Sequence, residues 1–218
     1  MKQMLKDTLI LFVITLISGL ALGAVYMLTK EPIEVQQEKK KAKAYQVVFE
    51  DAASFEDEEN FQVTDAAKVY LQSENVDYDS EEIMMFAKAL DANGELLGHV
   101  ITVTTHAGYG GDITFSMGIR LDGTLNGISI TAISETAGLG MRAPEVLVPQ
   151  FEGKDTASRF TVIKTEPTYP SEIDAISGAT ITTDALTNGV NAGVAYWKYR
   201  VQSDVESSNT VQGGVRNE

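Results

Sequence analysis

One stretch of this 218-residue chain carries the most chemical information, and it reads Asp174-Ala175-Ile176-Ser177-Gly178-Ala179-Thr180-Ile181-Thr182-Thr183. An amphipathic pattern follows it, in which apolar residues recur every three or four positions: Leu186, Val190, Val194, Trp197 and Val201. That spacing predicts a helix over residues 184–201 with one buried face. The hydroxyl-rich stretch is therefore expected to be a turn that leads into the N-terminus of a helix.

The start of a helix favours an anion, because its first N–H groups lack intrahelical partners and the helix dipole is positive there. Gly178 permits a tight turn, and Ala179 leaves the backbone open to approach. Phosphate is the usual ligand of such a site. A Ser or Thr helix cap explains the same residues more simply, although one hydroxyl suffices for a cap. Local physical chemistry leaves both explanations open.

Two hairpins are predicted upstream of this stretch. Residues 84–90 and 96–105 form one pair of strands around a glycine-containing turn, and residues 113–121 and 124–133 form the other around Asp122-Gly123. A glycine loop follows each hairpin, AGYG at 107–110 and AGLG at 137–140. Because these loops lie at equivalent ends of similar hairpins, we expect them to line one shared cleft.

The N-terminal region predicts a membrane anchor. Residues 8–28 read TLILFVITLISGLALGAVYML, which is 21 residues without a charge. As a helix this run is about 31 Å long, close to the thickness of the bilayer hydrocarbon. A cleaved signal peptide is the alternative, but the apolar run is longer than a usual signal core. Lys2 and Lys6 precede the run and favour a cytoplasmic N-terminus and an extracytoplasmic body.

Composition narrows the function further. The chain has 31 Asp and Glu against 17 Lys and Arg, a formal charge of −14, which makes it a poor binder of nucleic acid. It has no cysteine, which excludes disulfides, thiolate catalysis and cysteine-ligated iron–sulfur clusters. With only two histidines, redox chemistry would need a cofactor other than a metal.

Four parts are expected along the chain, in an overall α+β fold. Residues 1–30 form a cytoplasmic stub and transmembrane anchor. Residues 31–82 form a connecting segment, with a helix over 31–48 and an acidic loop over 51–60. Residues 83–201 form a domain of antiparallel hairpins and flanking helices. Residues 202–218 are polar and predict a disordered tail.

The pattern Asp174-x-x-Ser177-Gly178-Ala179-Thr180-x-Thr182 resembles the flavinylation motif of FMN-binding domains. Such domains occur in the G subunit of the Rnf ion-translocating electron-transport complex and in the C subunit of the Na⁺-pumping NADH:quinone reductase. The loop SETAGLG at 134–140 is similar to the ETPGLG loop of that family, with Ala137 in place of proline, and GYGG at 108–111 matches a third family element.

The resemblance implies a set of site residues. Thr182 would carry FMN through a phosphoester, installed from FAD by a flavin transferase outside the cytoplasm, and the adjacent Thr183 matches the motif spacing less well. The remaining cofactor-binding candidates are Ser177, Gly178, Ala179 and Thr180 near the phosphate, and Glu135, Thr136, Gly138, Leu139 and Gly140 near the flavin ring. Arg142 and His106 are further candidates for a flavin contact. Because a modifying enzyme must reach Thr182, we expect it on an exposed turn.

The resemblance also implies the function. The chain would be a covalent-FMN electron carrier, with no substrate reaction of its own, in a membrane complex that couples ferredoxin:NAD⁺ electron transfer to Na⁺ or H⁺ translocation. Its partners would be the other membrane subunits, the flavin transferase and membrane lipid. Two alternatives remain: the equivalent subunit of the quinone reductase, and an anchored module that binds a phosphorylated ligand without redox chemistry.

Overall fold

The structure is a computed structural model that describes residues 2–213, in two units whose boundary lies between Ala42 and Lys43. Helix α1 (Lys2–Val48) begins in the first unit and ends in the second. Its most apolar 18 residues have a mean hydropathy of 2.5, and none of them is buried in the protein. By length and composition this helix can span a membrane.

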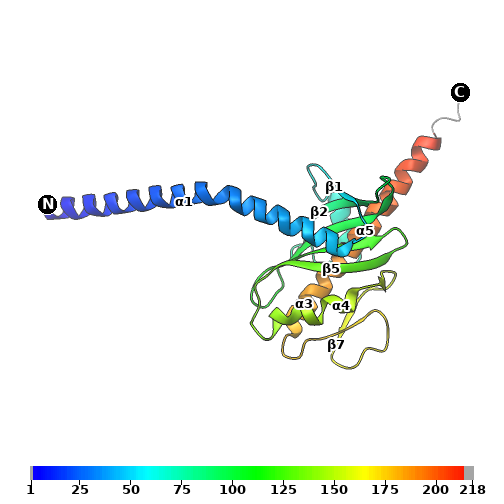
Figure 1. The fold of residues 1–218 in the computed structure, drawn as a ribbon. Helices are drawn as coiled ribbons and strands as arrows, with labels where there is room; N and C mark the ends of the chain where they lie inside the picture. Colours follow the sequence, from blue (N-terminus) through cyan, green and yellow to red (C-terminus); the bar gives the residue numbers. More distant parts are fainter. Residues whose placement is uncertain (1, 214–218) are drawn as a thin grey trace. The chain divides into compact units, whose positions relative to one another are not determined.

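The second unit is built on a six-stranded antiparallel sheet whose strands are neighbours in chain order (Figure 1). The strands are β1 (Ser54–Asp57), β2 (Glu81–Leu90), β3 (Leu96–Thr105), β4 (Ile113–Arg120), β5 (Thr124–Ile133) and β6 (Lys154–Asp155). Strands β2 and β3 form the first expected hairpin and β4 and β5 the second, which confirms both.

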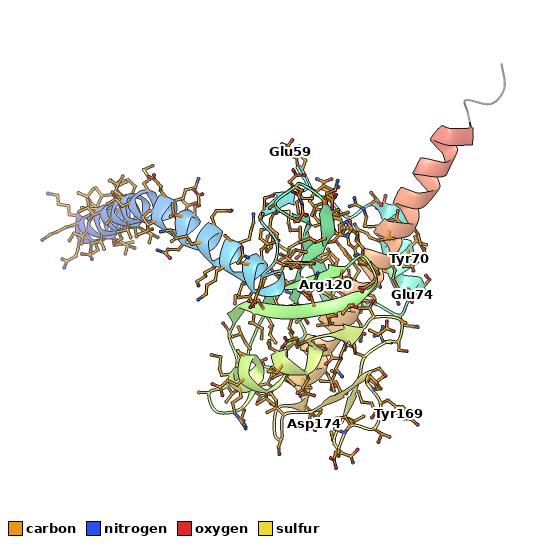
Figure 2. All side chains as sticks on the ribbon, turned by 45° about the vertical axis from the view of Figure 1, so that its right-hand side comes forward. Glu59, Tyr70, Glu74, Arg120, Tyr169 and Asp174 are labelled. Atoms are coloured by element: carbon orange, nitrogen blue, oxygen red, sulfur yellow. The ribbon has the colours of Figure 1, made fainter. Side chains whose placement is uncertain are left out.

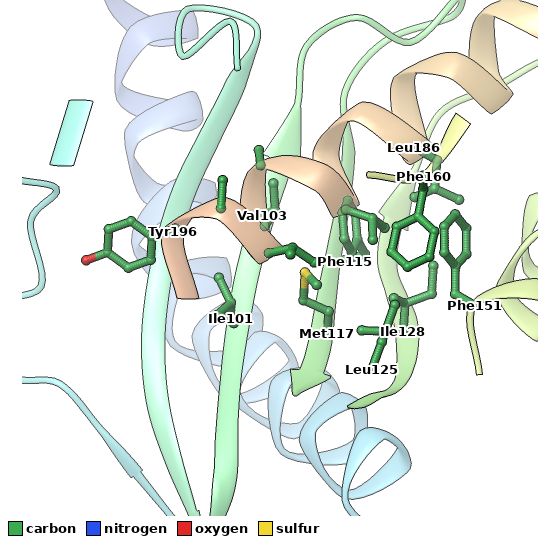
Figure 3. Close-up of a cluster of buried hydrophobic side chains, with 14 of the residues drawn as sticks. Ile101, Val103, Phe115, Met117, Leu125, Ile128, Phe151, Phe160, Leu186 and Tyr196 are labelled. Atoms are coloured by element: carbon green, nitrogen blue, oxygen red, sulfur yellow. The ribbon is translucent and has the colours of Figure 1, made fainter. Parts of the chain in front are cut away.

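Helix α5 (Thr180–Gly213) packs on one face of this sheet and forms the main core with it. Figure 3 shows Ile101 and Val103 of β3 and Phe115 and Met117 of β4 pointing toward the helix. On the helix side, the expected apolar stripe lies in this core, and Leu186 and Val190 are fully buried. Alternation along the strands sends every second side chain to this face.

The opposite face of the sheet packs against the last residues of α1 and the turn after it. Tyr45, Val48 and Phe49 are buried there together with Val100 of β3. The Phe49 ring lies so close to Gly118 of β4 that a Cβ on this glycine would come within 2.9 Å of the ring. The sheet is therefore covered on both faces, and its second cover comes from the helix that leads out of the apolar segment.

Smaller elements complete the second unit. They are α2 (Asp65–Ser73), the 3₁₀ turn η1 (Gly140–Arg142), α3 (Ala143–Val146), α4 (Val148–Phe151), and the short parallel pair β7 (Thr161–Ile163) and β8 (Glu172–Asp174). Asp174, labelled in Figure 2, ends β8 and begins the hydroxyl-rich stretch.

The structure differs from the sequence-based expectation between the anchor and the hairpins. Strand β1 lies inside the expected acidic loop, because its backbone pairs with β2 while its polar side chains face solvent. The compact unit that contains the sheet begins at Lys43, so it includes residues 43–82 of the expected connecting segment. At the other end, α5 continues through Gly213 where a disordered tail is expected from Gln202, and the last part of that tail, residues 214–218, lies outside the described residues.

Candidate functional site

A cavity of about 450 Å³ opens at one edge of the second unit, where three segments meet. The segments are the loop between β3 and β4, the loop after β5, and the start of α5. The residues that line the cavity are Tyr109, Glu135, Thr136, Leu139, Gly140, Gly178, Ala179, Thr180, Ile181 and Thr182. As expected, both glycine loops contribute to this single cleft.

The antiparallel register brings the first two segments together. Thr105 at the end of β3 pairs with Ile113 of β4, which in turn pairs with Ile133 at the end of β5. The loops that follow β3 and β5 therefore begin at the same edge of the sheet. The carboxylate of Glu135 joins the two loops, since it accepts hydrogen bonds from the backbone N–H of Tyr109 at 2.8 Å and of Gly110 at 3.2 Å.

The turn before α5 is closed by Thr183 and not by a residue of the cavity. Its hydroxyl accepts a hydrogen bond from the N–H of Ile176 at 3.2 Å and donates one to the carbonyl of Ala179 at 3.0 Å. Gly178 makes the turn with a φ of +78°, a left-handed conformation that side chains disfavour. The Thr183 hydroxyl therefore stabilises the turn through two hydrogen bonds and does not face the cavity.

The first N–H groups of α5 are left for a ligand. The earliest hydrogen bond within the helix runs from the N–H of Thr183 to the carbonyl of Ala179 at 3.1 Å. Within residues 2–213, no acceptor is found for the N–H groups of Thr180, Ile181 and Thr182. Three free donors at the positive end of a long helix, bordering a cavity, form a site suited to an anion such as phosphate.

Thr182 lies in the first turn of the helix and is only 1% exposed, so the expectation of an exposed turn is wrong. Its side chain is buried because the loop after β5 closes over it. A Cβ on Gly140 would lie 2.6 Å from the Thr182 Oγ1 and 2.9 Å from the Glu135 Oε2. In the described part of the chain this hydroxyl has no hydrogen-bond partner, and it borders the cavity.

Eight of the ten residues expected at the site line the cavity, and Ser177 and Gly138 do not. Neither Arg142 nor His106 lines it; His106 lies 2.9 Å from Asp112 and 3.5 Å from Glu82. The hydrogen bond to Asp112 raises the pKa of His106. Sequence reasoning about the site omitted Tyr109 and Ile181, although Tyr109 occupies the same place in its glycine loop as Leu139 does in the second.

The apolar part of the wall comes from exposed side chains. Tyr109 is 69% exposed, Ile181 53% and Leu139 40%, all unusually high for residues of their kind. They come from three different segments and gather around one opening. The cavity thus combines an anion-binding end with an apolar wall, which is the arrangement that a phosphorylated aromatic ligand requires.

Two family models match this chain. A family model described as the FMN-binding domain matches residues 108–195, a range that contains all three cavity segments, and a model of the RnfG N-terminal region matches residues 1–48. The G subunit of the Na⁺-translocating ferredoxin:NAD⁺ oxidoreductase complex of Acetobacterium woodii is 32% identical over 198 residues, which is 90% of this chain and 93% of that protein.

Two further similarities are more distant. The G subunit of the ion-translocating oxidoreductase complex of Methanosarcina acetivorans is 26% identical over 197 residues, covering 89% of this chain and 95% of that protein. The crystal structure of NqrC from Shewanella oneidensis is similar with a TM-score of 0.45 and 21% identity, over 53% of this chain and 59% of that one. This last similarity is too low to support an argument about function.

Proposed function

This chain belongs to the G-subunit family of Rnf-type ion-translocating oxidoreductase complexes, and from that premise we propose that it carries a covalent FMN on Thr182. The observation that carries the proposal is the meeting of three features in one cavity. These are the hydroxyl of Thr182, the three free N–H groups of the α5 start, and the apolar wall of Tyr109, Leu139 and Ile181. A phosphate ester on this hydroxyl would lie next to those donors.

The residues present fit this cofactor. An FMN phosphate needs hydrogen-bond donors and finds them in the backbone of Thr180, Ile181 and Thr182, while its ring system needs apolar surface. When bound, FMN supplies one- and two-electron redox chemistry. The chain itself would hold the flavin in place. Because the protein is acidic and would repel a free anionic flavin, a covalent bond is what keeps the local flavin concentration high.

Within the complex the chain would pass electrons and not ions. The relative from Acetobacterium woodii is a subunit of a complex named for ferredoxin:NAD⁺ oxidoreduction, and we propose the same reaction for the complex of this chain. Among the described residues only α1 can span a membrane, and a single helix does not enclose an ion path. Translocation of Na⁺ or H⁺ therefore belongs to partner subunits. The match to the RnfG N-terminal region favours this family over the quinone reductase.

Membrane placement is part of the same proposal. The apolar part of α1 would cross the bilayer once, with Lys2 and Lys6 on the cytoplasmic side and the flavin domain outside. A flavin transferase on that outer side would install the cofactor.

The experiment is modification of the full chain, co-expressed with the flavin transferase. We expect the wild-type peptide that contains Thr182 to gain the mass of FMN less water, and the denatured protein to fluoresce in a gel. Thr182→Ala should lose both signals, and Thr182→Ser should keep part of them. An unmodified wild-type peptide, or a fluorescent Thr182→Ala band, would show that the acceptor or the chemistry is wrong.

A further inference from the structure

The loop AGYG at residues 107–110 borders two cavities. Its Tyr109 lines the candidate flavin cavity, and its Ala107 lines a second cavity of about 350 Å³, which Glu81 and Arg159 also line. We propose that Glu81 is a positioning residue, which holds this loop in place from the second cavity and so fixes one wall of the first. The inference rests on the proposed function where it concerns the flavin, whereas the link from Glu81 to the loop does not require it.

Glu81 is connected to the loop through one hydroxyl. Its Oε1 accepts a hydrogen bond from the Thr105 hydroxyl at 3.2 Å, and the same hydroxyl accepts one from the backbone N–H of Ala107 at 3.3 Å. Thr105 is fully buried, and Glu81 is only 3% exposed. Because Thr105 is the last residue of β3 and Ala107 the first of the loop, these two bonds fix the direction in which the chain leaves the strand.

The start of β2 is joined to the same part of the chain at two further points. The backbone N–H of His106 donates to the carbonyl of Ser80 at 2.8 Å, and a ring nitrogen of His106 lies 3.5 Å from the Glu82 carboxylate. Farther along the loop, the N–H of Tyr109 donates to Glu135 in the first cavity. One short segment therefore connects the start of β2 to the wall of the flavin cavity.

The second carboxyl oxygen of Glu81 makes this connection sensitive to protonation. Oε2 has no hydrogen-bond partner among the described residues, and a Cβ on Gly189 of α5 would lie 3.2 Å from it and 3.0 Å from the Phe115 ring. A neutral carboxyl is tolerated in such an apolar place, whereas a carboxylate there costs free energy. Burial is accordingly the largest cause that raises the pKa of Glu81 to about 8, and the hydrogen bond from Thr105 opposes it in part.

The charged groups that act on Glu81 come from three segments. Asp77, in the loop before β2, raises the pKa of Glu81, while His106 and Arg159 lower it. Helix α5 contributes the uncharged Asn188 to the same cavity. Since burial outweighs these effects, the neutral carboxyl is the form that holds the loop at neutral pH.

The second cavity is a place where a charged Glu81 is solvated better. Arg159 lines it, and a volume of about 350 Å³ is large enough for several water molecules. Once Glu81 loses its proton, a rotation of its side chain toward this cavity brings the charge to water and to the Arg159 guanidinium. The same rotation takes Oε1 away from the Thr105 hydroxyl, so the loop loses its hold at Ala107.

The held and the released loop differ in proton binding over a defined pH range. In the held loop the pKa of Glu81 is about 8, and in a released loop, where water reaches the carboxylate, it lies near its usual 4.5. The stability of the held loop is therefore fully present below about pH 4.5 and is lost as the pH rises through about 8. In this range the equilibrium constant for release increases by up to about tenfold per pH unit.

Hydrogen exchange of the backbone amides of residues 107–110 tests the link without any flavin. The full, unmodified chain in detergent is compared with Glu81→Gln at about pH 6, 7 and 8, and each rate is corrected for the exchange rate of an unstructured peptide at that pH. Glutamine keeps an oxygen that accepts from Thr105, and it does not ionise. The protection of the wild type relative to Glu81→Gln should fall at least about tenfold between about pH 6 and about pH 8.

Three further variants separate this link from other causes. Thr105→Val removes the hydroxyl that joins Glu81 to Ala107, so protection of the loop should be low at every pH, and this variant keeps the test available if Glu81→Gln does not fold. His106→Asn removes the neighbouring titratable group and should keep the fall in protection. Glu145→Gln, an exposed glutamate of α3, is the matched control and should behave as the wild type. Circular dichroism checks that each variant is folded.

A second measurement connects the loop to the flavin. In the flavin-modified wild type, the fluorescence of the attached flavin should change over the same pH range as the protection of the loop. In flavin-modified Glu81→Gln it should stay constant, because the wall of the cavity remains in place.

Each outcome decides one point. A ratio of protection that does not depend on pH overturns the inference, and so does a fall that His106→Asn abolishes. Loop amides that exchange no faster than the core amides of β4 overturn it as well, because their exchange would then require the whole domain to unfold. Constant fluorescence with pH-dependent loop exchange overturns the positioning role at the flavin site. A wild type that never gains the flavin removes the proposed function instead, and the exchange measurement still decides whether Glu81 holds the loop.

Discussion

Gly140 packs directly against the buried Thr182. It belongs to η1 and has no left-handed backbone angle, so an alanine there is strained only by what its methyl group meets. That methyl group would lie 2.6 Å from the Thr182 Oγ1, far inside contact distance. The effect of an alanine at this position should therefore come from its contact with the Thr182 hydroxyl and not from backbone strain.

Gly140→Ala is expected to reduce flavin attachment strongly while the domain stays folded. The methyl group would overlap the Thr182 hydroxyl and the Glu135 side chain, so the hydroxyl has to leave the position that it occupies at the cavity. Mass spectrometry of the Thr182 peptide measures the modified fraction, and Ala137→Ser, an exposed change in the same loop, serves as control. Full modification of Gly140→Ala would mean that the loop moves away from Thr182 during the reaction.

Glu81 is a second residue with a measurable consequence, this time for stability. Its side chain is buried, its Oε1 accepts from the Thr105 hydroxyl at 3.2 Å, and its Oε2 has no partner among the described residues. Burial penalises the charged form and raises the pKa of Glu81 from 4.5 to about 8. Between these values the folded state binds more protons than the unfolded state.

The unfolding free energy of the wild type should therefore fall, relative to Glu81→Gln, as the pH rises from about 4.5 through about 8. The glutamine mimics the protonated acid and does not titrate. His106, whose raised pKa gives a slope of the same sign, is present in both proteins, and its charge lowers the pKa of Glu81 and so opposes part of the effect of burial. Urea unfolding at several pH values gives this difference, and a constant value would contradict the assignment.

The start of helix α5 both closes the preceding turn and lines the cavity, and two neighbouring threonines perform these two roles. Thr183 closes the turn through its two hydrogen bonds, and Thr182 faces the cavity. The helix can present free N–H groups to a ligand because this closure comes from inside its first turn and leaves its first three donors unused.

Thr183→Val should lower the unfolding free energy by about 1–3 kcal/mol, because it leaves the buried N–H of Ile176 without its partner. Thr187→Val is the matched control one turn later: its hydroxyl is buried without a partner in the described chain, so its loss should cost nothing. Denaturant unfolding compares the two. Equal effects would show that the turn before α5 does not depend on Thr183.

The chain consists of an apolar helical unit up to Ala42 and a second unit, from Lys43, that has its own core. The boundary lies inside α1, so that Tyr45 and Val48 of the same helix already belong to the second core. Over residues 2–42 the first unit contributes no buried side chain, while the second unit buries both faces of its sheet. Folding of the second unit should therefore not depend on the first.

Deletion of residues 2–42 should release the protein from membranes without unfolding it. The full chain is expected to remain in the pellet after an alkaline carbonate wash, and the shortened chain to be in the supernatant with the same thermal transition as the full chain in detergent. The deletion stops before Lys43, because the residues that cover the sheet, from Tyr45 onward, must be kept. A shortened chain that pellets or has no cooperative transition would contradict the division into units.

Much of this protein follows from local sequence. Residues 84–133 alternate and turn in a way that predicts both hairpins, and the spacing of Leu186 to Trp197 predicts the buried face of α5. The uninterrupted apolar run predicts α1. Strand β1 was not predictable, because Ser54–Asp57 has no apolar alternation and becomes a strand only by pairing with the edge of β2.

The candidate site was also predictable from the sequence in part. The motif at 174–183 and the two glycine loops place eight of the expected residues around the cavity, since residue type and spacing fix turns and helix starts. The burial of Thr182, the packing of Gly140 against its hydroxyl and the place of Tyr109 in the wall were decided only by the tertiary structure. Each depends on how loops from distant strands meet over the start of α5, and such contacts depend on packing between segments that local spacing does not specify.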